Sequence, residues 1–203
     1  MRMVAKQIGM DYFDDSTYQS NRMMYWASCP SNGEFVFDDN SGQALDVEKY
    51  LDMYEDWRDI SQWPTSSRES EVIKKETTAQ KNPLEKEGTV GVFCRAYPTI
   101  QEVINEFLSD VYAPTATDSR YDYLEADSIA GVVIYDNVFA YSHHTSDPAC
   151  GKLLNGFDLI RVHRFGDLEE KKSFNAMCEF ALSLEKVKMQ IAAERKEKVD
   201  RDF

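Results

Sequence analysis

Two apolar runs that flank an Asp136-Asn137 pair constrain the fold of this chain more than any other feature. The runs, GVVIY and VFAYSHH, are rich in the β-branched and aromatic residues that favour strands. Asp and Asn are typical of the tight turns that join two antiparallel strands. Residues 131–144 are therefore predicted to form a β-hairpin.

Several segments carry apolar residues at helical spacing. Thr99 and Glu102 have the spacing of a capping box, which predicts that a helix begins at residue 100. Its apolar face comprises Ile100, Val103, Ile104 and Phe107. Asp46 is a plausible N-cap for a second helix, with Val47, Tyr50, Leu51 and Tyr54 on one side. A short helix over 155–165, with Phe157, Ile160 and Phe165 inward, and a helix or helix pair over 173–201 complete the helical prediction.

The N-terminal third is less regular. Residues 1–9 resemble the end of an amphipathic helix, with Met3, Val4 and Ile8 inward and Gly9 as its stop. The run RMMYWAS at 22–28 predicts a buried strand, and SNGEFVFDD at 31–39 predicts a turn followed by a short strand. A polar run follows Pro64.

Together these patterns predict an α+β fold with small antiparallel hairpins, several amphipathic helices packed on them and a long helical C-terminus. The polar run is expected to be an exposed helical connector over 61–82, which divides a segment at 1–60 from an α+β domain at 83–170. The C-terminal helix or helix pair then occupies 171–203.

The chain is acidic, with 36 Asp and Glu against 23 Lys and Arg and a net charge of −13. Such a field repels nucleic-acid phosphate and attracts basic partners. The asymmetry is strongest over residues 10–60, which hold twelve acidic and three basic residues. This stretch is either a solubilising surface or a patch that imitates phosphate. Its candidate partner-binding residues are Asp38, Asp39, Asp46, Glu48, Asp52, Glu55, Asp56 and Asp59.

The cysteines favour an intracellular protein with reduced thiols. Cys29, Cys94, Cys150 and Cys178 show no C-x-x-C spacing, and the N-terminus has no apolar signal core. Cys94 lies among apolar residues and is expected to be a buried structural thiol. No apolar run approaches the roughly 18 residues that a membrane span requires, so we expect a cytoplasmic protein with no membrane role.

A candidate metal site follows the hairpin, where His143, His144, Asp147 and Cys150 are all residue types that zinc accepts. Adjacent residues of a strand, however, point to opposite faces, so only one of the two histidines can readily join a site. We therefore expect no bound metal or other cofactor. The segment is instead predicted to turn into a Pro-containing loop, with one imidazole bonded to the backbone and the other in solvent.

Motifs of nucleotide binding and nucleophilic catalysis are missing from the sequence. It contains no G-x-x-x-x-G-K-[ST] and no G-x-S-x-G. Asp14 and Asp15 follow Phe13 without a D-x-D on an apolar strand, so on the residues alone they are predicted to be turn and cap residues rather than ligands of a two-metal centre.

Four blocks of the sequence resemble a known family when taken together. They are IGMDYFDDSTYQSNRMMYWAS, PLEKEGTVGVFCRAYPTIQEVI, YDNVFAYSHHTSDPACGKLLNGFDLIRVHRFGD and SFNAMCEFALSLEKVKMQIAAER. In this order they are similar to phage and prophage primase-helicases related to the virulence-associated E group. The resemblance implies that residues 1–60 are a remnant of the C-terminal part of an archaeo-eukaryotic-type primase core. It matches Asp14 to the last carboxylate of the primase metal site and places Arg22 near the cleft.

The resemblance has departures and gaps. The family tends to have proline where Ala27 stands and cysteine where Leu154 stands, so zinc ligation does not carry over. Its paired carboxylates, its catalytic histidine motif and its helicase P-loop would lie beyond the two ends of this sequence. An incomplete primase-polymerase core is therefore expected, and catalysis is not.

The sequence is compatible with two functions. The first is a non-catalytic acidic binding protein derived from a phage primase, whose partner is the basic groove of a nucleic-acid-binding protein such as a host defence nuclease of CRISPR type. The alternative is an accessory or bridging module of a phage replication primase-helicase, which acts with DNA and replication proteins. In that alternative Lys152, Arg161 and Arg164 are the candidate DNA contacts.

Overall fold

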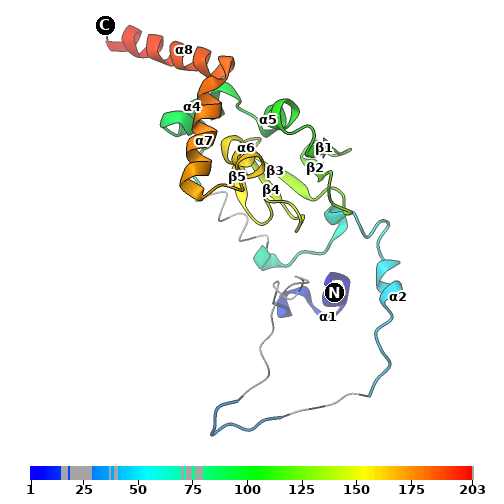
Figure 1. Ribbon diagram of the computed structural model, residues 1–203. Coiled ribbons are helices and arrows are strands. Elements are labelled where there is room, and N and C mark those ends of the chain that lie inside the picture. The colour runs from blue at the N-terminus through cyan, green and yellow to red at the C-terminus, as the bar shows by residue number, and fades with distance from the viewer. Residues whose placement is uncertain are drawn as a thin grey trace. The chain divides into compact units, whose positions relative to one another are not determined.

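The computed structural model describes residues 1–14, 18, 29–36, 38, 41–69, 71, 75 and 80–202 (Figure 1). The chain divides into two compact units. The first comprises residues 1–57 and 62–71, and the second comprises 58–61 and 72–203.

The first unit begins with helix α1 (Arg2–Ile8), which ends at Gly9 as predicted. Gly9 has a φ of 127°, a conformation that favours glycine. A 3₁₀ turn, η1 (Met10–Tyr12), follows. The buried side of α1 differs from the prediction, because Met3 and Ala5 are buried whereas Ile8 is 65% exposed. The small Ala5 therefore occupies the packed side that the apolar pattern had assigned to Ile8.

Polar contacts hold the rest of this unit to its N-terminal helix. Arg2 donates to the carbonyl oxygen of Pro64 at 2.8 Å and forms an ion pair with Glu69 at 2.8 Å. Asp11 Oδ1 accepts from the backbone N–H of Ser67 at 2.9 Å and from its hydroxyl at 3.0 Å. These two hydrogen bonds lower the pKa of Asp11.

The acidic segment contains the short helix α2 (Val47–Leu51). Asp46 caps it as predicted and accepts from the N–H of Lys49 at 3.4 Å. The helix is shorter than expected, since Val47 and Leu51 are exposed and no buried apolar face extends it.

Two strand predictions in the N-terminal third have different outcomes. The one at 22–28 lies outside the described residues. Where a strand was expected after the turn at 31–33, residues 34–36 form none and are exposed, so that prediction is wrong for them.

The second unit is built on a five-stranded antiparallel sheet whose strands pair in chain order. The strands are β1 (Tyr112–Pro114), β2 (Arg120–Tyr123), β3 (Val132–Tyr135), β4 (Phe139–Ser142) and β5 (Leu153–Asn155). The predicted hairpin is β3 and β4, with Tyr135 opposite Phe139 and Val132 opposite Ser142. Asp136 and Asn137 have φ values of 51° and 61°, which suit a type I′ turn.

Helices pack with this sheet (Figure 1). They are α4 (Gly88–Ala96), α5 (Ile100–Phe107), α6 (Gly156–Arg164), α7 (Glu170–Ser183) and α8 (Glu185–Asp202), with 3₁₀ turns η3 (Ile60–Gln62) and η4 (Pro83–Glu85). Thr99 caps α5 by accepting from the N–H of Glu102 at 3.2 Å, and the predicted apolar face of α5 is buried. The α+β class is thus confirmed.

An aromatic cluster forms the centre of the core. Phe93 of α4 lies 5.9 Å, between ring centroids, from Phe157 of α6, and Phe107 of α5 lies 5.7 Å from Phe180 of α7. Arg95 fixes α8 against α4 through two hydrogen bonds to Glu194, at 2.6 and 3.0 Å. Helices α4, α5, α6 and α7 therefore pack around one apolar centre. This packing sets the position of α6 and of the start of α7 relative to the sheet.

Candidate functional site

The loop between β4 and β5, residues 143–152, contains all the predicted metal-ligand types, but they contact different partners. The His143 ring stacks edge-on against Tyr141, at 4.8 Å between centroids. His144 is buried, and its Nδ1 lies 2.9 Å from the hydroxyl of Ser128. The partner of the buried imidazole is therefore a side-chain hydroxyl rather than the predicted backbone group. Burial lowers the pKa of His144, which favours the neutral ring.

Asp147 joins a buried polar cluster that the sequence did not reveal. The hydroxyl of Tyr112, on β1, donates to Asp147 Oδ2 at 2.9 Å and lies 2.7 Å from Nε2 of His163, on α6. Asp147 Oδ1 lies 3.4 Å from the same Nε2 and also accepts from the N–H of Ala149 at 2.7 Å. A strand, a loop and a helix thus converge on one carboxylate.

The hydrogen bonds of this cluster assign the protonation of His163. The single proton of the Tyr112 hydroxyl is directed to Asp147, so the short contact to His163 requires Nε2 to carry a proton and donate. Burial lowers the pKa of His163 although the Asp147 carboxylate opposes this shift. The ring is therefore neutral near pH 7, with a proton on Nε2 and a bare Nδ1. Burial, with the nearby Asp147 charge, also raises the pKa of Tyr112, so its hydroxyl stays protonated.

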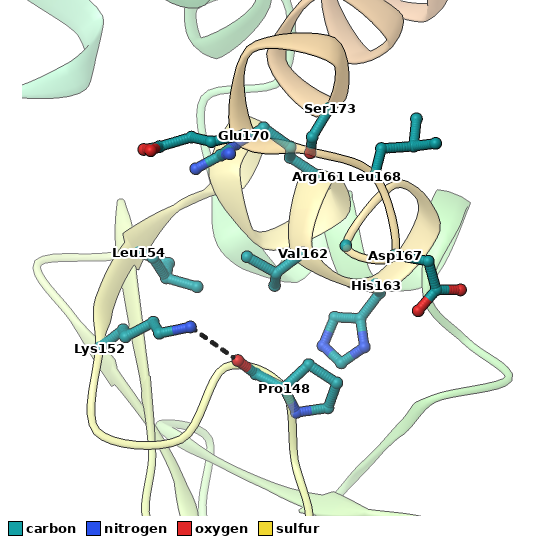
Figure 2. A pocket seen from close by; sticks show the side chains of 11 residues that line it. Pro148, Lys152, Leu154, Arg161, Val162, His163, Asp167, Leu168, Glu170 and Ser173 are labelled. Atoms are coloured by element: carbon teal, nitrogen blue, oxygen red, sulfur yellow. Dashed lines mark hydrogen bonds between the residues drawn. The ribbon is translucent and has the colours of Figure 1, made fainter.

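An open hollow of about 610 Å³ lies against this cluster. It is lined by Pro148, Lys152, Leu154, Arg161, Val162, His163, Gly166, Asp167, Leu168, Glu170 and Ser173. Figure 2 shows Lys152 and Leu154 on one side, Asp167 and Leu168 on the other, and the His163 ring between them. The hollow is therefore walled by β5, the end of α6, the start of α7 and the loop that contains Asp147.

The three candidate DNA contacts lie close together in the fold, but each already interacts with the protein. Lys152 Nζ donates to the carbonyl oxygen of Pro148 at 3.2 Å, and Arg161 pairs with Asp158 at 3.0 Å. Arg164 donates to the carbonyl oxygen of Phe107 at 2.8 Å and lies over the rings of Phe107 and Phe180. Lys152 and Arg161 line the hollow, whereas Arg164 is fastened to the aromatic core.

The candidate acidic residues lie mostly at the surface. Asp38, Asp46, Glu48, Asp52 and Glu55 are exposed, Asp56 and Asp59 are half-buried, and Asp39 lies outside the described residues. Large apolar side chains are exposed in the same segment: Leu45, Val47, Leu51, Met53 and Trp57.

The remaining candidates have separate locations. Asp14 is exposed, after η1, and Arg22 lies outside the described residues. Cys94 is buried as predicted, and burial raises its pKa to about 11, so the thiol is inert near neutral pH. Cys150 is half-buried, and burial raises its pKa as well. Across the described ranges, no three His, Cys, Asp or Glu side chains are placed to hold one metal ion.

Two functional groups escaped the sequence analysis. Tyr112 and His163 are 51 residues apart and belong to a strand and a helix that the sequence does not relate. The only signal was a histidine on a helix whose other inward residues are apolar.

The helices in the described part of the chain include none that is long and apolar enough for a membrane span.

The N-terminal part of the chain is similar to a known family. Residues 1–66 match the family model of the VapE N-terminal domain, which covers about a third of the chain. No curated protein and no solved structure matches the chain. The match supports a VapE-like phage or prophage protein and a phage-associated module related to primase-helicases.

Proposed function

We propose that this chain is a non-catalytic binding protein of phage origin, whose acidic segment at 38–59 occupies the basic groove of a nucleic-acid-binding protein. The partner we infer is a bacterial nuclease that otherwise holds DNA or RNA in that groove, such as a defence nuclease of CRISPR type. The observation that supports this best is the exposure, within one segment, of carboxylates alternating with large apolar side chains.

The local composition favours a protein partner over a purely solvated surface. Val47 is 60% exposed and Trp57 is 50% exposed, and both stand among the carboxylates of Asp46, Glu48 and Glu55. Trp is enriched at the centres of protein interfaces, where its ring fills a pocket. The carboxylates then steer association with a basic surface and select against acidic ones. An acidic segment used only for solubility gains nothing from exposed Trp and Val side chains.

A second function is favoured by the match itself. A VapE N-terminal domain over residues 1–66 points to an accessory or bridging module of a phage primase-helicase. Lys152 and Arg161 would then contact DNA at the hollow. The protein's net charge of −13 opposes this function, because the field of the acidic protein repels the DNA phosphates that Lys152 and Arg161 would have to bind.

Two variants of equal net charge test the proposal. The first replaces Asp46, Glu48, Asp52 and Glu55 with Asn or Gln, so that the net charge rises from −13 to −9. The Asp46→Asn change still leaves a cap on α2, because Asn and Asp are equivalent N-caps. The control makes the same four charge changes at Glu179, Glu185, Glu197 and Asp200, exposed residues of α7 and α8. Net charge is thereby matched, and the control differs in location and in losing the exposed ion pair of Glu185 with Lys188.

Binding is measured by biolayer interferometry against a panel of purified host nucleases, each with its groove empty and then filled with DNA. The intact protein and the control variant should bind the empty form, and the segment variant should bind at least about tenfold more weakly. Binding should also weaken as the Debye length falls from about 10 Å to 3 Å with added salt. Equal binding by the two variants, or binding that pre-bound DNA does not reduce, would refute the proposal.

A further inference from the structure

The hollow beside α6 contains two cations whose donors are only partly used. Arg161 pairs with Asp158 through Nε, at 3.0 Å, and no described residue accepts from its two terminal nitrogens. Lys152 donates one of its three N–H groups to the carbonyl oxygen of Pro148, at 3.2 Å. Both residues line the hollow, and Figure 2 shows their cationic groups on the same side of it, with Leu154 between them. Two charges with free N–H donors therefore border one space.

A buried hydroxyl adds a third donor. Ser173, on α7, is only 3% exposed, yet it lines the hollow, so the part of it that remains accessible faces this space. Its hydroxyl forms no hydrogen bond with another described residue, and in Figure 2 its oxygen points from α7 toward Arg161. Buried hydroxyls in proteins are normally paired. An unpaired one beside two cations indicates a place for an acceptor from outside the chain.

Contacts at the start of α6 fix the position of the Arg161 guanidinium. Asp158 accepts from Arg161 through Oδ1 and from the side-chain amide of Asn155 through Oδ2, at 2.9 Å. Asn155 in turn caps α6 by accepting from the N–H of Asp158, at 3.0 Å. Asp158 and Asn155 are therefore positioning residues. They hold the guanidinium at the hollow before a ligand binds, which lowers the entropy cost of binding.

The first turn of α7 also has unused donors. The helix begins at Glu170, and its N-cap, Glu169, makes no side-chain cap hydrogen bond. The N–H groups at the start of a helix have no acceptor within it, and together with the helix dipole they favour an anion. Glu170 and Ser173 place this turn at the edge of the hollow. The helix end therefore adds to the attraction that the two cations exert on an anion.

The carboxylates of the lining restrict the kind of anion. Asp167 and Glu170 are exposed and form no ion pair with Lys152 or Arg161. Figure 2 shows the two carboxylates on opposite sides of the hollow and directed outward. A nucleic-acid strand would have to bring its neighbouring phosphates past these carboxylates, which repel them. The arrangement therefore favours a single small anion over a polymer.

The rest of the lining suits an organic group. Leu154, Val162 and Leu168 supply apolar surface. The volume of about 610 Å³ lies within the range of about 300–1,000 Å³ that is typical of small-molecule pockets. A ligand that fills this hollow therefore has an apolar part as well as a charged group.

We propose that this hollow binds a small phosphate monoester. Arg161, Lys152 and the Ser173 hydroxyl donate to the phosphate oxygens, and the organic part packs on Leu154 and Val162. A phosphate is preferred to a carboxylate, because its three oxygens can accept from three separate donors at once. The site lies in the second unit and uses no residue of the acidic segment, so its test is independent of that of the proposed function.

Phenyl phosphate and phenol form the matched pair of probes, because they share the ring and differ in the phosphate. Binding to the full chain is followed by ¹H–¹⁵N NMR at constant ionic strength near pH 7.5, well above the second pKa of a phosphate monoester, about 6. We expect phenyl phosphate to bind with a dissociation constant on the order of 1 mM or tighter and to shift the guanidinium signals of Arg161. Phenol should bind at least about tenfold more weakly. Equal binding of the two probes would overturn the anion site.

Variants locate the binding. Lys152→Gln and Ser173→Ala should each weaken the binding of phenyl phosphate several-fold. The control is Lys196→Gln, which makes the same charge change at an exposed lysine of α8 that does not line the hollow, and it should bind as the intact protein does. Unchanged binding in either hollow variant, or an equal loss in Lys196→Gln, would overturn the proposal.

Two further probes distinguish the source of the phosphate. Inorganic phosphate lacks the organic part, and thymidylyl-thymidine carries a phosphodiester without a terminal phosphate. We expect inorganic phosphate to bind several-fold more weakly than phenyl phosphate, and the dinucleotide more weakly still. Equal or tighter binding of inorganic phosphate would overturn the organic part of the ligand. Binding of the dinucleotide as tight as that of phenyl phosphate would overturn the small ester in favour of a nucleic-acid strand.

Discussion

Removing the hydroxyl of Tyr112 tests the buried cluster that shapes the hollow. Tyr112→Phe keeps the ring, so no cavity forms, but it removes one hydrogen bond to the carboxylate of Asp147 and one contact with His163. A hydrogen bond to a charged group contributes about 1.5–3 kcal/mol, and its loss leaves a buried acceptor partly unsatisfied. Asp147 retains the N–H of Ala149, at 2.7 Å, so the expected cost is about 2 kcal/mol.

Urea denaturation followed by circular dichroism measures this cost. The free energy of unfolding falls by about 2 kcal/mol per molar urea. The loss therefore lowers the urea concentration at the unfolding midpoint by about 1 M and leaves this dependence on urea unchanged. Tyr121→Phe is the matched control, because Tyr121 is a buried tyrosine of β2 whose hydroxyl makes no hydrogen bond with another described residue. The control should change stability by less than about 0.5 kcal/mol. Equal midpoints for the two variants would refute the role assigned to the Tyr112 hydroxyl.

Three further predictions concern the second unit. Burial lowers the pKa of His144 and of His163 below the ordinary value of 6.5. Below pH 6.5 the unfolded chain therefore binds protons that the folded chain does not. The free energy of unfolding should be complete above pH 6.5 and should fall as the pH drops below it, by up to about 1.4 kcal/mol per pH unit for each histidine. Thermal melts from pH 7.5 to 5 check this, and His144→Gln should reduce the slope. Arg95→Lys removes the forked contact with Glu194, so the amides of α8 should exchange with deuterium faster than those of α7. Metal analysis of the purified protein should find no stoichiometric zinc, and a chelator should leave the melting temperature unchanged.

Local patterns predicted the parts of the fold in which neighbouring residues determine the structure. The Asp136-Asn137 turn, the Thr99 cap and the Asp46 cap each depend on contacts within a few residues, and each is observed. The length of α2 was overestimated because helical spacing shows only that a face could be buried. Whether Val47 and Leu51 have anything to pack against is a tertiary property.

The candidate site was only partly accessible to sequence reasoning. The adjacent histidines drew attention because they are neighbours, yet neighbouring positions diverge, and His143 and His144 contact different partners. The actual cluster joins His163 and Tyr112 to Asp147, and the order of the strands and the packing of α6 bring them together. No spacing rule connects a strand residue to a helix residue so distant in sequence. Contacts of this kind follow from the fold rather than from a motif.

The most direct test of the proposed function is whether the purified full chain binds nucleic acid by itself. Fluorescence anisotropy with labelled single-stranded and forked DNA measures this affinity. The salt concentration is roughly 0.1 M, because contacts with phosphate still release counterions and strengthen binding there. We predict binding weaker than about 100 μM, because the acidic surface repels phosphate. Micromolar or tighter binding that is lost in a Lys152→Gln, Arg161→Gln variant would contradict the proposed function and establish the replication module in its place.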